Sequence, residues 1–128
     1  MAIRVVRLGS PRASGEGLRL GTVRRPPRGV PKSEFASRDF YDVWVPDLAP
    51  SEALVKQALS ADSDRAWRAF ERRYRMEMKR PGAARLMDLL AALSRHTSLS
   101  VGCYCADEAR CHRSILRELL KEKGATIG

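Results

Sequence analysis

The sequence predicts a small α/β layer fold, in which a sheet of roughly four strands, mostly parallel or mixed, is covered by about four helices. Short β-branched or alternating runs, typical of strands, occur near the start of the chain and again near residue 100. Between and after them, apolar residues recur at helical spacing. The order of strands, helices, strand and helix indicates a Rossmann-like sheet with helices packed against it.

The four expected strands lie at residues 3–8, 18–23, 41–45 and 98–104. They are rich in β-branched or aromatic residues, and Pro46 ends the third. The first two are candidates to pair with each other. Within the third strand, Trp44 is expected in the core, because a large aromatic residue in an apolar strand usually packs.

Four helices are expected from apolar periodicity and from start and stop signals. Ser51 is the expected N-cap of the first, and the sequence Asp62-Ser63-Asp64 begins a second helix at about residues 64–79. Pro81 and Gly82 separate it from a third at 83–94, and a fourth spans 111–123. The expected apolar faces comprise Leu54, Val55, Ala58, Leu59, Trp67, Phe70, Tyr74, Met78, Leu86, Leu89, Leu90, Leu93, Ile115, Leu116, Leu119 and Leu120.

The composition is that of a basic globular protein, and its 128 residues are expected to form one domain. The net charge of +9 favours a polyanionic partner, either nucleic acid or a phosphorylated small molecule. The alternative is a solvated basic surface without a partner. Because the three cysteines lie close together and are odd in number, a reduced, cytoplasmic setting is expected rather than a disulfide framework. No stretch is apolar enough for a signal peptide or a membrane span, so no membrane partner is expected.

Two stretches are rich in cations. The first, residues 24–32 (RRPPRGVPK), directly follows an expected strand, and its prolines and glycine exclude regular structure. Arginines held on such a rigid loop are candidates to bind an anion, and the alternative is a stiff, solvated surface loop. The candidates there are Arg24, Arg25 and Arg28, with Asp42 of the next strand either facing solvent or reaching toward them.

The second cationic stretch is a ridge along the expected helix at residues 64–79. At about 100° per residue its cations cluster on one side of that helix. The ridge is a candidate to follow a nucleic-acid backbone, and the alternative is a solvated helix face. It comprises Arg65, Arg68, Arg72, Arg75 and Lys79.

All three cysteines and one of the two histidines lie within residues 103–112. One interpretation is a reactive thiol. Cys111 would lie near a helix N-terminus, where the helix dipole and Arg113 favour the thiolate, with His112 as general acid or base. Cys105 is the other candidate, on a strand-to-helix loop similar in layout to the thiolate-binding loops of rhodaneses and cysteine phosphatases, although not with the phosphatase spacing.

The same residues are chemically suited to zinc, as a set formed by Cys103, Cys105, Cys111 and His112. Their spacing, C-x-C-x5-C-H, differs from the common zinc motifs, and adjacent Cys111 and His112 are hard to converge on one ion. A third interpretation makes the cysteines small buried apolar residues. The three interpretations stay open at this point.

A parallel sheet would join the two most unusual stretches. Ligands bind beyond the carboxyl ends of the strands in open α/β sheets. Residues 24–28 and 103–105 each follow an expected strand, so parallel strands would bring the arginine loop and the cysteine turn to one crevice. Antiparallel strands would separate them.

Four segments together resemble a known bacterial family: RRPPRGVPK (24–32), YDVWVPDLAPS (41–51), FERRYRMEM (70–78) and VGCYCADEARCHRSILRELL (101–120). The chain is similar to the domain of unknown function 488 (DUF488) family, the YeaO-like proteins, in a branch that has the CYC and CHR residues. Other members resemble it in the PRGV and APS segments but lack the cysteines. The resemblance implies a compact α/β domain and brings no catalytic role.

The leading hypothesis is that a phosphate-bearing ligand, a nucleotide or nucleic acid, binds between the arginine loop and the Cys/His turn. Arg24, Arg25, Arg28 and Arg113 would hold the anion, and Cys105 or Cys111 would react if the protein is an enzyme. The alternatives are a non-catalytic nucleic-acid-binding module that uses the ridge, and a small zinc-binding protein.

Overall fold

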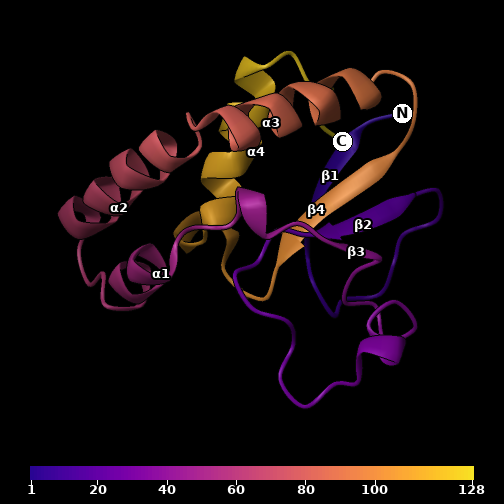
Figure 1. Ribbon diagram of the computed structural model, residues 1–128, viewed down its shortest axis with the longest axis horizontal. Helices are drawn as coiled ribbons and strands as arrows, with labels where there is room; N and C mark the ends of the chain where they lie inside the picture. Colours follow the sequence, from indigo (N-terminus) through magenta and orange to yellow (C-terminus); the bar gives the residue numbers. More distant parts are fainter.

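The computed structural model describes all residues, 1–128, and confirms the predicted α/β fold. Four parallel strands form one sheet in the order β1-β4-β2-β3 (Figure 1). The strands are β1 (Ile3–Arg7), β2 (Leu18–Gly21), β3 (Val43–Trp44) and β4 (Leu99–Cys103).

The last strand in the sequence, β4, lies inside the sheet. It pairs with β1 and with β2, so Leu99 is the partner of both Ile3 and Leu18. All five β4 residues are buried, and none of them is charged, which suits a position with neighbours on every side. The expected pairing of the first two strands is therefore wrong, because β4 separates them.

Four α-helices lie together beside the sheet, and α3 crosses in front of α4 in Figure 1. The helices are α1 (Glu52–Leu59), α2 (Asp64–Glu77), α3 (Pro81–Leu93) and α4 (His112–Glu122). The side chains of Ser51 and Ser63 cap α1 and α2 by accepting hydrogen bonds from backbone N–H groups. None of the helices combines the length and apolar character needed to cross a bilayer.

The main core lies between the sheet and the helices. It joins strand residues such as Val101 to helix residues such as Phe70, Tyr74 and Leu116. Several expected core residues are instead exposed: Leu59 is 84% exposed, Leu89 54%, Trp44 43% and Leu93 38%. On α3 the buried face is formed by Ala83, Met87, Leu90 and Ala91, because its position against α4 and the rest of the core selects a stripe with smaller residues.

A buried ion pair lies under the other face of the sheet. Arg19 is fully buried, and its guanidinium donates to both carboxylate oxygens of Glu16, at 2.8 and 2.9 Å. Arg19 also donates to the carbonyls of Ser10 and Asp39, and Ser100 donates to Glu16. The hydrogen bond from Arg19 is the main reason that the pKa of Glu16 falls to about 2. Alternation in the sequence places Arg19 opposite the apolar face but does not show that it is buried.

Candidate functional site

A cavity of about 360 Å³ opens at the carboxyl ends of β2 and β4. Residues 23–25, which follow β2, form one wall, and residues 103–105 form another. Pro50, several residues of α1, Phe70 of α2 and residues 110–112 complete the lining. The strands are parallel, so the arginine loop and the cysteine turn do meet at one edge of the sheet.

Two of the thiols face each other at the base of this cavity. Cys103 is the last residue of β4, and Cys111 is the N-cap residue of α4. Both are buried, and their Sγ atoms are 3.0 Å apart. The short helix at Glu108–Arg110 returns the chain from one to the other. Cys105 lies on this connection, and its thiol-bearing side chain is exposed.

His112 is held as a neutral ring with a defined tautomer. Its Nε2 lies 2.7 Å from the carbonyl oxygen of Thr22. Because a carbonyl only accepts, Nε2 carries the proton and Nδ1 has a free lone pair. That Nδ1 lies 3.8 Å from the Sγ of Cys111. Burial lowers the pKa of His112 to about 4, so the ring is neutral at pH 7.

Arg113 is a buried cation beside the exposed thiol. Its Nη2 donates to the backbone carbonyl of Cys105 at 2.6 Å, and its Nε has no hydrogen-bond partner. None of the ion pairs in the chain includes Arg113. Its positive charge therefore remains uncompensated by a carboxylate next to Cys105.

The three thiols differ in acidity. The neighbouring Cys103 and Cys111 thiols, and after them the charge of Arg113, lower the pKa of Cys105. The pKa of Cys103 is raised by the same interaction with Cys105, then by Cys111 and by burial. Cys103 acts to lower the pKa of Cys111, but Cys105 and burial together raise it. The exposed Cys105 is therefore the thiol that carries the negative charge most readily.

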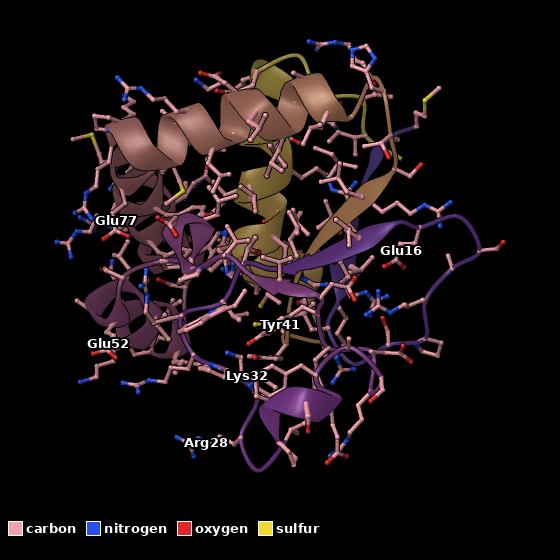
Figure 2. The ribbon with its side chains drawn as sticks, turned by 45° about the vertical axis from the view of Figure 1, so that its right-hand side comes forward. Glu16, Arg28, Lys32, Tyr41, Glu52 and Glu77 are labelled. Carbon is pink, nitrogen blue, oxygen red and sulfur yellow. The ribbon has the colours of Figure 1, made fainter.

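Of the three arginines in the loop, Arg24 and Arg25 line the cavity and Arg28 does not. The guanidinium of Arg24 donates to the carbonyls of Pro50, Pro46 and Ala49 at 3.0–3.3 Å, which ties the loop to the start of α1. Arg25 forms an ion pair with Glu52. Arg28 does not line the cavity, and Figure 2 shows it at the outer end of the loop, pointing away from the body of the protein.

Asp42 does not reach the arginine loop. Its carboxylate accepts hydrogen bonds from Arg12, at 2.8 and 3.1 Å, and from the backbone N–H of Arg19. The hydrogen bond from Arg12 is the main cause of its lowered pKa. Asp42 therefore joins the network around Arg19 and lies apart from the cavity residues.

The cationic ridge lies on the exposed side of α2. Arg65, Arg68, Arg72 and Lys79 are exposed, while Arg75 is half-buried in ion pairs with Glu71 and Glu122. Phe70 lines the cavity from the same helix, but no ridge residue does. The ridge and the cavity are thus two separate surfaces.

Sequence reasoning missed several parts of the site. The carbonyl of Thr22 orients His112, and Tyr41 packs with Cys103 and Cys111 while its hydroxyl has no partner. Figure 2 shows Tyr41 close to the sulfur atoms. Glu52 and Lys56 enter the lining because α1 lies over the loop. The sequence carried no signal for Thr22, because the expected strand at residues 18–23 included it, whereas β2 ends at Gly21.

These features define a class: a small parallel α/β domain with a thiol-rich pocket at the carboxyl ends of its strands. The chain belongs to the DUF488 family, since the model of DUF488-N3a, described as the active DUF488-N3 subclade, matches residues 3–124. No curated protein and no solved structure matches the chain significantly.

Proposed function

We propose that the cavity binds a small phosphate-bearing ligand of the nucleotide class and presents Cys105 to it as a reactive thiolate. The observation that carries this proposal is that one cavity joins Arg24 and Arg25 to the exposed thiol of Cys105. The volume of about 360 Å³ is within the usual range for small-molecule sites.

The charge of the lining supports an anionic ligand. Four cations line the cavity, Arg24, Arg25, Lys56 and Arg110, against the single acid Glu52. Arg25 and Arg110 form ion pairs with Glu52 and Asp64. Arg24 donates only to backbone carbonyls, and no carboxylate pairs with Lys56. A phosphate group would therefore meet an excess of positive charge.

The remaining wall supports an apolar or aromatic part of the ligand. Val23, Val55, Leu59 and Phe70 line the cavity, and Leu59 is largely exposed there. A nucleotide has both a flat apolar base and a phosphate, which matches a lining that contains both apolar and cationic side chains.

Cys105 is the residue suited to react with such a ligand. It is exposed in the cavity, whereas Cys103 and Cys111 are buried. The charge of Arg113, which no carboxylate compensates, stabilises a thiolate at this position. In this role the Cys105 thiolate would form a bond to an electrophilic centre of the bound ligand as the bond from that centre to its leaving group breaks, and the leaving group would depart with the electron pair.

The test is alkylation of the reduced protein by iodoacetamide near pH 7, with each cysteine followed by peptide mass mapping. Cys105 should react fastest, and adenosine monophosphate or inorganic phosphate should slow its reaction. Arg25→Ala should weaken this protection, whereas the matched variant Arg28→Ala, from the outer end of the same loop, should retain it. Equal labelling of all three cysteines, or a rate that no phosphate compound changes, would rule out the proposal.

A second candidate is a zinc site formed by Cys103, Cys111 and His112. Their ligand atoms all lie within 4.8 Å of one another. The specific observation in its favour is the hydrogen bond from Nε2 of His112 to the Thr22 carbonyl, since zinc-binding histidines commonly donate their second N–H to such an acceptor. Two thiols and one free imidazole nitrogen suit zinc, and Cys105, the fourth predicted ligand, is not part of this set.

Zinc analysis of the purified protein by mass spectrometry tests this candidate. We expect about one zinc per chain, in keeping with a single three-ligand site. Cys111→Ser should lose the metal, and Cys105→Ser should keep it. Metal-free protein of undiminished stability would exclude the zinc site.

A further inference from the structure

We propose that the three cysteines form a thiol–disulfide exchange relay, in which Cys105 reacts with a small-molecule disulfide and the oxidised product is a buried disulfide between Cys103 and Cys111. This proposal goes beyond ligand binding, because it needs neither phosphate nor the arginine loop. It rests on the contact between the two buried sulfur atoms, on the position of the Cys105 backbone beside Cys103, and on the different exposure of the three thiols.

The first observation is the contact between the two buried sulfurs. The Sγ atoms of Cys103 and Cys111 are 3.0 Å apart, so an approach of about 1 Å would bring them to the length of a disulfide bond. Cys103 is the last residue of β4 and Cys111 is the N-cap residue of α4, so each is attached to a regular element. The backbone therefore already holds this pair in position.

The second observation is that an outside reagent reaches only the third thiol easily. Cys103 is 4% and Cys111 2% exposed, whereas Cys105 is exposed. Cys105 lies on the connection between the other two, and its backbone N–H lies 3.4 Å from the Sγ of Cys103. The exposed cysteine is thus both open to solvent and adjacent to the buried pair.

The exchange has three balanced steps. The Cys105 sulfur attacks a disulfide RSSR, which forms the Cys105–SR bond, breaks the RS–SR bond and releases the first RSH with the Cys105 proton. The Cys111 sulfur then attacks the Cys105 sulfur, which forms a Cys105–Cys111 disulfide and releases the second RSH with the Cys111 proton. Finally the Cys103 sulfur attacks the Cys111 sulfur and its proton passes to Cys105, which leaves as a thiol. Overall two protein thiols are oxidised and one RSSR is reduced to two RSH.

Burial favours the Cys103–Cys111 disulfide as the end point. Returning thiols cannot reach its sulfurs as readily as they reach Cys105, so the reverse attack is hindered. The pairing also joins the end of β4 to the start of α4, eight positions apart in the sequence, whereas Cys103 and Cys105 are only two positions apart. The relay therefore ends with Cys105 free again. Because both buried sulfurs belong to the candidate zinc set, this disulfide and a bound zinc exclude each other.

The test reduces the purified protein, removes any bound metal with a chelator and treats the protein with oxidised glutathione. Alkylation with iodoacetamide and peptide mapping follow. We expect a Cys103–Cys111 disulfide with loss of two hydrogens, and an alkylated Cys105. Cys105→Ser, an exposed and conservative change, should slow formation of this disulfide about tenfold or more, because the buried pair loses its point of entry. Cys103→Ser should stop the relay early and leave Cys105 bound to glutathione or to Cys111.

Three results would overturn the relay. They are a stable glutathione adduct on Cys105 of the unmodified sequence, a final Cys105–Cys111 disulfide, and a rate that Cys105→Ser does not change. Circular dichroism of each variant checks that it is folded before the comparison. Protection of Cys105 by phosphate is measured separately on the reduced protein, so the relay and the proposed ligand site can fail independently.

Discussion

The protein has two buried polar clusters, and they differ in whether their groups are satisfied within the chain. In the cluster around Arg19, the guanidinium donates to both oxygens of Glu16 and to two backbone carbonyls. Glu16 also accepts hydrogen bonds from Ser100 and from the backbone of Ala13. Every charge has a partner, so this cluster can be explained by its contribution to folding alone.

The cluster around the thiols leaves groups unpaired. The chain has two buried side-chain nitrogen or oxygen atoms without a hydrogen-bond partner, the Nε of Arg113 and the hydroxyl of Tyr41. Both belong to residues at the cysteine end of the sheet. An unpaired buried polar group costs free energy, so each of these two calls for an explanation other than folding, such as a catalytic role or a bound water or ion. The difference between the clusters therefore sets a fully paired structural network apart from the cluster that we propose as the functional site.

The largest expected change in stability is at Arg19, one of the two buried arginines. Arg19→Met should lower the free energy of unfolding by about 3–5 kcal/mol, because Glu16 remains as a buried charge without its partner. Urea denaturation measures this loss. Arg28→Ala serves as the exposed control and should change stability by less than about 0.5 kcal/mol. A loss below about 1 kcal/mol for Arg19→Met would contradict the structural role of that cluster.

Acid should weaken the same cluster. The pKa of Glu16 is lowered from 4.5 to about 2, so its contribution to stability is present above pH 4.5 and is lost as the pH falls toward 2. This contribution is roughly 3 kcal/mol by linkage. In denaturation at a series of pH values, the unmodified protein should lose this amount over that window. Glu16→Gln should lose correspondingly less, while the exposed variant Glu34→Gln should follow the unmodified protein.

Arg113, the other buried arginine, is expected to matter less for the free energy of unfolding and more for the reactivity of Cys105. Arg113→Met should change the free energy of unfolding by no more than about 1.5 kcal/mol, since no carboxylate loses a partner. Iodoacetamide labelling of Cys105 at pH 7 should slow about tenfold, because the positive charge that favours its thiolate is gone. If Arg113→Met destabilised the fold as much as Arg19→Met, the distinction between the clusters would not hold.

The smallest effect on stability is expected from the ridge on α2, which lies outside both clusters. Under the nucleic-acid hypothesis, replacing Arg68 and Arg72 by alanine should reduce the slope of log affinity against log salt by about 2. The double variant should retain thiol labelling and should alter stability by about 0.5 kcal/mol or less per site. Arg75→Ala, whose side chain is already paired with two acids, is the matched control. A salt slope that the double variant leaves unchanged excludes the ridge as a binding face.

The sequence by itself determined the elements and their class. Local signals were sufficient for this: apolar periodicity gave the helices, Ser51 capped α1, and alternation gave the strands. It also located the Cys/His turn between β4 and α4, because three cysteines within residues 103–111 stand out against the rest of the chain. Each of these features depends on residues that are neighbours in the sequence.

Only the tertiary structure decided which surfaces are buried and which side chains meet. The segments that carry Glu16, Ser10 and Asp39 enclose Arg19, which is fully buried, and the Thr22 carbonyl lies against His112. The exposure of Leu89 and the convergence of Cys111 with His112 were likewise unexpected. Periodicity shows which residues share a face, but burial of that face depends on partners distant in the sequence, which no local pattern specifies.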